Sequence, residues 1–101
     1  MGPIAEETLH RLHADILFLG VDGFDVQYGL STPNLLEAKV NRAMIEISKT
    51  AVAVCDSSKF GKRSLSLIAP PTSLQHVITD SGIPKADLSA LKKSGIEVTV
   101  A

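Results

Sequence analysis

Two short polar segments carry residue types that bind phosphorylated, hydroxyl-rich ligands, and each directly follows an apolar run. Segment 56–59 is Asp-Ser-Ser-Lys, in which the ammonium group of Lys59 suits a phosphate and the serine hydroxyls can donate to its oxygens. Segment 22–25 is Asp-Gly-Phe-Asp. Its carboxylates accept hydrogen bonds from sugar hydroxyls, and its glycine permits either a close backbone approach or a positive φ. The predicted ligand-binding residues are Asp22, Gly23, Asp25, Asp56, Ser57, Ser58 and Lys59.

The same carboxylates also have a purely structural interpretation. An aspartate after a strand often caps the following turn, and Asp22 or Asp56 can alternatively pair with Lys59. Lys62 and Arg63 add positive charge beside Lys59, and they either steer an anionic ligand or form ordinary solvated surface. Spacing alone leaves both interpretations open.

The remaining reactive side chains predict neither a metal site nor a covalent one. His10 and His13 lie three residues apart in a predicted helix, but no third ligand is near them in the sequence. Cys55 lies in an apolar run beside Asp56, whose charge raises the pKa of a thiol, so we expect an inert core residue. A single cysteine excludes an internal disulfide, and no cofactor is predicted.

Four apolar runs rich in β-branched residues predict strands over residues 16–21, 51–55, 76–79 and 96–100. The first two lack an alternating polar face, which is the pattern of strands in a parallel sheet buried on both faces by helices. The last run alternates apolar residues with Glu97 and Thr99, as a half-exposed edge strand does. Ligands bind outside the carboxyl ends of parallel strands, so both polar segments are expected at one edge of this sheet.

Amphipathic patterns between the strands predict helices over residues 35–49, 85–94 and 4–13. Asn34 is the predicted N-cap of the first, with Glu37 three residues later, and Gly95 is the predicted stop of the second. The predicted buried stripe of the longest helix is Leu36, Val40, Ala43, Met44 and Ile47. Residues 64–75 are irregular, with a short strand over 65–68 as one option. This order predicts an α/β fold, a mostly parallel sheet with flanking helices and right-handed crossovers.

Length and charge limit the class of protein. The 101 residues make one domain at most, and 10 Lys and Arg against 11 Asp and Glu give a net charge of −1, without the basic footprint of a nucleic-acid-binding surface. No apolar run is long enough to span a membrane and no signal peptide is recognisable, so we expect the cytosol. The helix predicted over residues 4–13 has no predicted strand before it, which suggests that the sequence is part of a larger domain. The open sheet edge that this leaves favours a homo-oligomer.

Six segments in a fixed order resemble the C-terminal part of DeoR-family transcriptional repressors, most closely the AgaR/GlpR-type branch. They are Phe18–Asp25, Gly29–Asn34, Glu37–Ala38, Val40–Ile45, Asp56–Gly61 and Ile78–Asp80. The resemblance covers about residues 14–100, so it is specific although each motif alone is weak. It implies part of the fold shared by ribose-5-phosphate isomerase, glucosamine-6-phosphate deaminase and CoA transferases. Residues 1–101 would be the C-terminal portion of a sensor domain, with its first half and a winged helix-turn-helix outside this sequence.

The resemblance implies a bacterial regulator of carbohydrate metabolism that performs no chemistry and binds a phosphorylated sugar as its effector. DNA would be bound only through the domain outside this sequence. The residues that match the family's two ligand loops are Asp22, Gly23 and Asp25, then Asp56, Ser58 and Lys59. The alternative is a sugar-phosphate isomerase-like enzyme fragment, with Asp22 or Asp25 as a substrate ligand or as the base and Lys59 holding the phosphate. The glycine-rich segment and catalytic glutamate of such an enzyme are missing, since residues 29–42 predict a loop and a helix, so the sensor is favoured.

Overall fold

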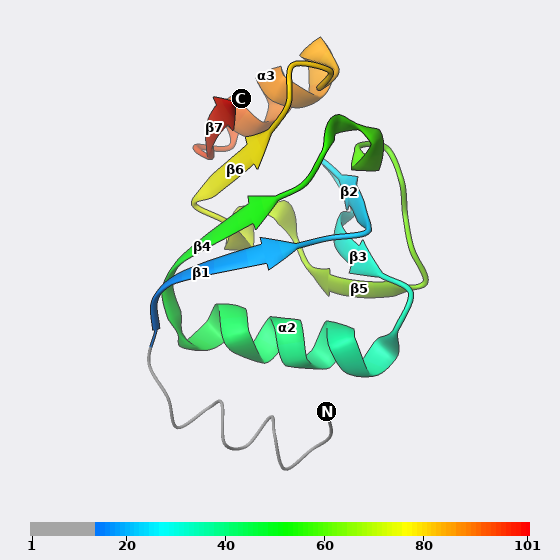
Figure 1. Cartoon of the computed structure of the whole chain (residues 1–101), viewed down its shortest axis with the longest axis vertical. Coiled ribbons are helices and arrows are strands. Elements are labelled where there is room, and N and C mark those ends of the chain that lie inside the picture. The colour runs from blue at the N-terminus through cyan, green and yellow to red at the C-terminus, as the bar shows by residue number, and fades with distance from the viewer. Residues whose placement is uncertain (1–13) are drawn as a thin grey trace.

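A computed structural model of the chain describes residues 14–101, and the helix predicted over 4–13 lies outside them. The larger sheet is parallel throughout, with the strand order β1 (Ala14–Gly20), β4 (Ser48–Val54), β6 (His76–Thr79) and β7 (Glu97–Val100) (Figure 1). The predicted α/β class, the parallel sheet and the position of β7 at its edge are confirmed. No described helix has the length and apolar composition needed to cross a bilayer.

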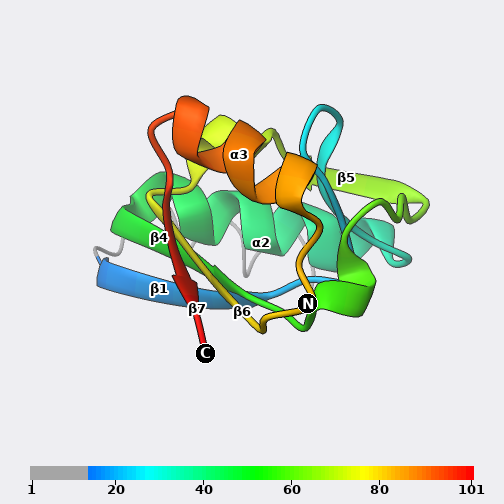
Figure 2. The ribbon, with the colours of Figure 1, turned by 90° about the horizontal axis from the view of Figure 1, so that it is seen from above.

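Two α-helices of the described chain connect these strands. Helix α2 (Leu35–Ile47) precedes β4, and α3 (Lys85–Lys93) connects β6 to β7. Because the strand order in the sheet is also the chain order, right-handed crossovers place every connection on the same face. Figure 2 shows α2 and α3 on one side of the sheet.

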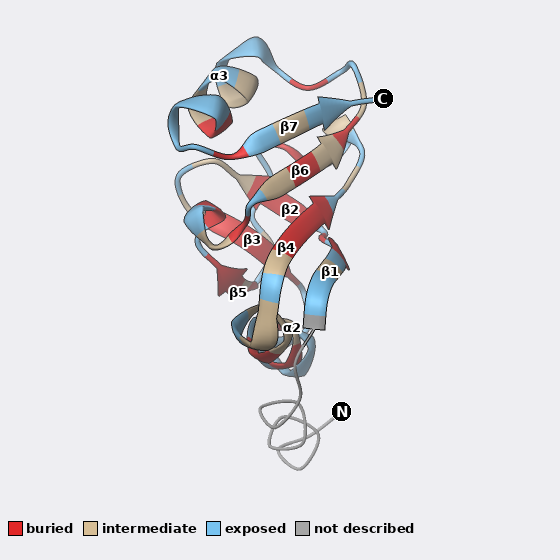
Figure 3. Ribbon diagram, turned by 90° about the vertical axis from the view of Figure 1, so that its left-hand side faces the viewer, coloured by how far each residue is buried: buried red, intermediate tan, exposed pale blue. Residues whose placement is uncertain are grey.

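Within residues 14–101 the helices cover one face of the sheet, and on the second face Val52 is buried whereas β1 is exposed, so the predicted burial on both faces is not found for β1. Leu19, Ala51 and Ala53 face the helices and belong to the core. On the opposite face, Ile16 and Phe18 are 56% and 65% exposed, and β1 is largely exposed in Figure 3. Within the described residues the cause is topological, since strands added in one direction by right-handed crossovers place both connecting helices on the same face.

A second, three-stranded antiparallel sheet packs beside the first and was mostly missed by the sequence patterns. It has the order β2 (Gly23–Asp25), β3 (Gly29–Thr32) and β5 (Ser66–Ala69). Only β5 was anticipated, as the short strand over 65–68. Arg42 of α2 fixes the helix to β5, donating from its guanidinium group to the carbonyl oxygens of Ile68 and Leu67 at 2.8 Å each.

Helix α2 begins as predicted and ends early. Oδ1 of Asn34 accepts a hydrogen bond from the amide of Glu37 at 3.0 Å, which confirms the N-cap. The helix ends at Ile47, before the predicted end at residue 49, and β4 begins directly at Ser48. Its buried residues are Ala38, Val40 and Ala43, whereas Leu36 is 49% exposed, so the buried stripe is rotated from the predicted one. Helix α3 and Gly95, with φ of 82°, agree with prediction.

Candidate ligand-binding site

The candidate site lies at the carboxyl edge of the parallel sheet, where three turns meet. Gly20 of β1 lies beside Val54 of β4, and Val54 lies beside Ile78 of β6. Segments 22–25 and 56–59 therefore leave the sheet from neighbouring strands at one edge, as expected, and the turn at Asp80 leaves from the next strand (Figure 1).

The first two of these turns are in direct contact. The amide of Gly61 donates a 2.9 Å hydrogen bond to the carbonyl oxygen of Phe24, and the rings of Phe24 and Phe60 stack with centroids 4.9 Å apart. Gly23 is needed for this contact, since a Cβ there would lie 2.6 Å from the carbonyl oxygen of Lys62. Its φ is not positive, so the close approach is the property that matters.

Asp56 caps the short turn that contains Lys59. Its Oδ1 accepts hydrogen bonds from the amide of Ser58, at 3.0 Å, and from the hydroxyl of Ser58. The turn is a single 3₁₀ segment, Ser57–Lys59. The hydroxyl and then the amide of Ser58 hold the pKa of Asp56 below its ordinary value. The structural interpretation of Asp56 as a cap therefore has direct support.

Asp80, which follows β6, holds the same turn from the other side. Its Oδ2 accepts a 2.8 Å hydrogen bond from the amide of Ser57, and its Oδ1 accepts one of 2.8 Å from the amide of Gly82. Hydrogen bonds from the side chain and amide of Ser57, and then from Gly82, lower the pKa of Asp80. Sequence reasoning did not include Asp80 in the site, although its position directly after a strand was the available signal.

Asp22 is exposed and connects to the start of α2 through Thr32. The buried hydroxyl of Thr32 lies 3.1 Å from Oδ2 of Asp22 and 3.2 Å from Oε2 of Glu37. A hydroxyl has one proton, so it donates to one of these carboxylates at a time. Glu37 also lines a cavity of about 230 Å³ with Asn34, Leu36 and Val40. The two acidic side chains thus face a common hydroxyl at the rim of the site.

Asp25 has partners for both of its carboxylate oxygens. Oδ1 accepts from the amides of Gln27 and Tyr28 at 2.9 and 2.8 Å, and Oδ2 accepts from Nε of Arg63 at 3.0 Å. The amides of Tyr28 and Gln27, followed by the Arg63 guanidinium, lower the pKa of Asp25. The guanidinium also lies 4.9 Å from the centroid of the Tyr28 ring. These contacts fix the β2–β3 turn and give Arg63 a structural partner.

Lys59 is half-buried and makes no ion pair with another residue in the range 14–101. The suggested pairing of Asp22 or Asp56 with Lys59 is therefore absent from this range. Lys62 is exposed on the following turn, next to Arg63. The described residues contain no group of three His, Cys, Asp or Glu side chains that is placed to hold a metal ion.

Cys55 lies directly behind the site at the end of β4 and is half-buried. Burial, then the negative charges of Asp56 and Asp80, raise the pKa of its thiol to about 11. This confirms the predicted direction of the shift, although burial contributes more than the neighbouring aspartate.

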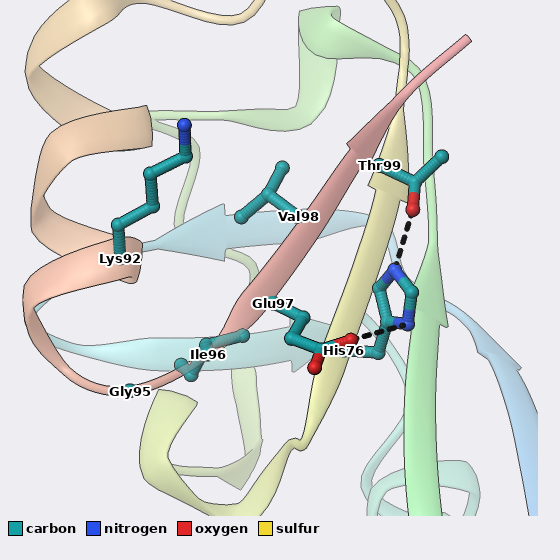
Figure 4. A pocket seen from close by; sticks show the side chains of 7 residues that line it. All are labelled: His76, Lys92, Gly95, Ile96, Glu97, Val98 and Thr99. Atoms are coloured by element: carbon teal, nitrogen blue, oxygen red, sulfur yellow. Dashed lines mark hydrogen bonds and ion pairs between the residues drawn. The ribbon is translucent and has the colours of Figure 1, made fainter.

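A larger pocket, of about 510 Å³, lies elsewhere and contains none of the predicted site residues (Figure 4). It surrounds the start of β7 and the end of α3. His76 lies 2.7 Å from the hydroxyl of Thr99 and 3.9 Å from a carboxylate oxygen of Glu97. His76 and Glu97 begin their parallel strands, so this pocket is at the opposite edge of the sheet from the candidate site.

The fold and these loops define a small α/β domain, and sequence comparison assigns its family. The chain belongs to the family described as the DeoR C terminal sensor domain, whose family model matches residues 1–81. This confirms the resemblance found in the sequence.

Individual relatives are named as transcriptional regulators. The chain is 44% identical to the putative aga operon transcriptional repressor of Escherichia coli O157:H7 over 97 residues, or 96% of this chain and 36% of that protein. It is 40% identical to the uncharacterized HTH-type transcriptional regulator YulB of Bacillus subtilis and 36% identical to the HTH-type transcriptional regulator GlpR of Haloferax volcanii. Each of these two matches covers 97% of this chain and 38% of the relative. The chain therefore spans less than two fifths of the length of these relatives.

Proposed function

We propose that the turns at the carboxyl edge bind a phosphorylated sugar and that the chain is the effector-sensing part of a repressor of carbohydrate metabolism. In this proposal, Lys59 binds the phosphate and Asp22 accepts hydrogen bonds from sugar hydroxyls. The hydroxyls of Ser57 and Ser58 leave their carboxylate partners Asp80 and Asp56 to donate to the phosphate. The bound ligand favours one of two states of the longer protein that differ in their affinity for DNA.

The observation that carries this proposal is the direct contact between the two polar turns. The hydrogen bond from Gly61 to Phe24 joins the turn of Lys59 to the strand that follows Asp22. A cationic group and an exposed carboxylate thus come from contacting segments, which suits one ligand that carries both a phosphate and hydroxyls. Gly23, Asp25 and Asp56 then have supporting roles, because their contacts shape these turns.

The ionisation of the acidic residues favours a sensor over an isomerase-like enzyme. A carboxylate that removes a proton near neutral pH works best with a raised pKa. Hydrogen bonds lower the pKa of Asp25, one of the two candidate bases, which is the opposite direction. The relatives that resemble the chain are also named as transcriptional regulators and not as enzymes.

The relatives are more than twice as long as this chain, so the proposal also concerns a longer protein. We propose that residues 1–101 are the C-terminal portion of a sensor domain and that another domain of the longer protein binds DNA. The site of action would be the cytosol, where sugar phosphates and bacterial DNA meet. We also propose that the protein is a homo-oligomer, because within residues 14–101 an apolar strand, β1, is exposed at one edge of the sheet.

Thermal unfolding in the presence of a panel of sugar phosphates tests the ligand class. A ligand at about 100 times its dissociation constant should stabilise the folded state by about 2.7 kcal/mol. For a domain of this size, that corresponds to a rise of about 10 °C or more in the unfolding midpoint. The unphosphorylated sugar and inorganic phosphate serve as separate arms, and each should stabilise the domain less than the sugar phosphate does.

Two lysine variants make the test specific to the proposed phosphate contact. Lys59→Ala should weaken binding of the stabilising sugar phosphate at least about tenfold, the loss of a charge-assisted hydrogen bond. Lys62→Ala makes the same change three residues away on an exposed side chain and should bind nearly as the wild type does. Wild-type affinity in Lys59→Ala would overturn the phosphate assignment, and a panel without any stabilising sugar phosphate would overturn the ligand class.

A further inference from the structure

The turn that carries Lys59 and the turn that follows β6 meet at Ser57. We call them the Lys59 turn (residues 56–61) and the Asp80 turn (residues 80–84). Oδ2 of Asp80 accepts a 2.8 Å hydrogen bond from the amide of Ser57, and the hydroxyl of Ser57 also donates to this carboxylate. Gly82 packs so closely against the same serine that a side chain there would collide with Oγ of Ser57. The Ser57 hydroxyl is therefore half-buried between the two turns and already has an acceptor.

The two serine hydroxyls of the Lys59 turn differ in where their acceptors lie. The hydroxyl of Ser58 donates to Asp56, two residues away in the same turn. The hydroxyl of Ser57 donates to Asp80, which is 23 residues away and directly follows the neighbouring strand β6. A change of acceptor at Ser58 is therefore a local event, whereas a change of acceptor at Ser57 breaks a contact between two elements of the fold.

A phosphate bound at Lys59 competes with Asp80 for the hydroxyl of Ser57. A serine hydroxyl has one proton, so it donates to the carboxylate or to a phosphate oxygen and not to both. Asp80 is ionised at neutral pH, because hydrogen bonds from the side chain and amide of Ser57, and then from Gly82, lower its pKa. Its negative charge also repels a phosphate that contacts the same serine. The arrangement of the two turns in this structure is therefore one that a phosphate has to displace.

The Asp80 turn leads directly into helix α3. The amide of Ile83 donates to the carbonyl oxygen of Asp80 at 3.3 Å, and the side chain of Ile83 is buried in the core. Pro84, whose ring fixes φ, is the N-cap of α3, and the helix begins at Lys85. Figure 2 shows this segment running from the sheet edge to the start of α3. A displacement of Asp80 away from Ser57 is therefore passed to α3 through a short and constrained connection.

We propose that the carboxylate of Asp80 holds the Lys59 turn in a state that excludes phosphate, and that effector binding takes the Ser57 hydroxyl, releases the Asp80 turn and shifts α3. This inference rests on the proposed function and adds to it the element that responds to the ligand. It also supplies the differential affinity that a two-state sensor requires, because the ligand binds better to the state in which Asp80 has left Ser57. Helix α3 is then the part of this chain that reports occupancy of the site.

Titration of the isotopically labelled protein with inorganic phosphate, at constant ionic strength and followed by NMR, tests the competition. Asp80→Asn keeps the shape of the side chain but removes its charge and weakens its acceptor oxygen. Phosphate should therefore bind to this variant at least about fivefold more tightly than to the wild type. Loosening of the turn by Asp80→Asn lowers stability, so a purely structural role of Asp80 predicts no gain in affinity.

Two further variants separate the shared hydroxyl from the charge of Asp80. Asp87→Asn removes the same charge from the first turn of α3 and should bind phosphate as the wild type does. In a Ser57→Ala background, the gain in affinity from Asp80→Asn should be smaller, because the hydroxyl for which Asp80 and phosphate compete is absent. The NMR spectra of all variants show directly whether each of them is folded.

The same spectra test the response of α3. In the wild type, phosphate should shift the amide signals of Gly82 and of Leu88, whose amide donates to Pro84 in the first turn of α3, with the midpoint observed for Ser57. Shifts confined to residues 56–61 would overturn the coupling to α3. Equal phosphate affinity in the wild type and Asp80→Asn would overturn the competition, as would a gain that persists undiminished in Ser57→Ala. If phosphate binds to no variant, this inference fails, and the sugar-phosphate panel with Lys59→Ala decides the proposed function separately.

Discussion

The amide of Ser57 donates a 2.8 Å hydrogen bond to Oδ2 of Asp80, which ties the turn after β4 to the turn after β6. The second oxygen of Asp80 accepts from Gly82, so a single carboxylate organises both turns. A side chain at Gly82 would collide with Oγ of Ser57, which explains the glycine at that position. The turn that carries Lys59 is therefore positioned by a neighbouring strand as well as by its own.

Replacing Asp80 with asparagine should loosen this turn. Asp80→Asn keeps one acceptor oxygen and substitutes an NH₂ donor for the other, so the amide of either Ser57 or Gly82 loses its partner. We expect hydrogen exchange at that amide to accelerate about tenfold or more, together with a lower thermal midpoint. Asp15→Asn makes the same chemical change at an exposed site in β1 and should alter neither. Unchanged exchange at both amides would contradict this role of Asp80.

The lowered pKa values of the turn aspartates predict how stability depends on pH. Asp25 has a lowered pKa because of the amides of Tyr28 and Gln27 and the Arg63 guanidinium, and the pKa values of Asp56 and Asp80 are lowered too. A carboxyl group whose pKa is lower in the folded than in the unfolded protein stabilises the folded state at pH values above its unfolded pKa, which is about 3.9. That contribution is lost as the pH falls through the folded pKa. The free energy of unfolding should therefore decline below about pH 4.

Urea unfolding at pH 7 and at pH 3 measures this dependence. Asp25→Asn should be less stable than the wild type at pH 7 and should lose less stability between the two pH values, because one of the responsible carboxyls is gone. A variant with the wild-type difference between pH 7 and pH 3 would show that the contacts of Asp25 do not affect folding.

The parts of this fold that were predictable are those with local signals. Long apolar runs identified β1 and β4, and their parallel pairing placed Asp22 and Lys59 at one edge. Asn34 identified the start of α2 through a contact three residues along the chain. In each of these cases the relevant interaction is either short-range or follows from strand direction alone.

The parts that were missed depend on contacts between distant residues. β2 and β3 have three and four residues, too few for a periodic pattern, and β3 is completed by pairing Leu30 with Ala69. The structural role of Asp25 depends on Arg63, 38 residues away. The exposure of Phe18 follows from both crossovers lying on one face, and its apolar character alone indicated the reverse.

Replacing Gly23, the glycine of segment 22–25, should disturb the contact between the two turns. In Gly23→Ala, the new methyl group would lie 2.6 Å from the carbonyl oxygen of Lys62 and 2.7 Å from Oγ of Ser31, so the two turns must separate. We expect a loss of about 1–3 kcal/mol of stability, typical of overpacking. Gly20→Ala is the control, because nothing lies within 4 Å of the added atom and the φ is not positive. Equal unfolding midpoints in urea for the two variants would contradict the close approach.

The thiol of Cys55 reports on the electrostatics of the same edge. Because its pKa is raised to about 11, by burial first and then by Asp56 and Asp80, alkylation by iodoacetamide should rise with pH to above pH 10 without a plateau. Asp56→Asn removes a nearby negative charge, so it should lower the pKa and increase the alkylation rate at pH 8 severalfold. Asp87→Asn, in the first turn of α3, should leave the rate unchanged. Rates in urea correct for intrinsic reactivity. A rate in Asp56→Asn equal to that of the wild type would mean that the charge of Asp56 does not raise the pKa of this thiol.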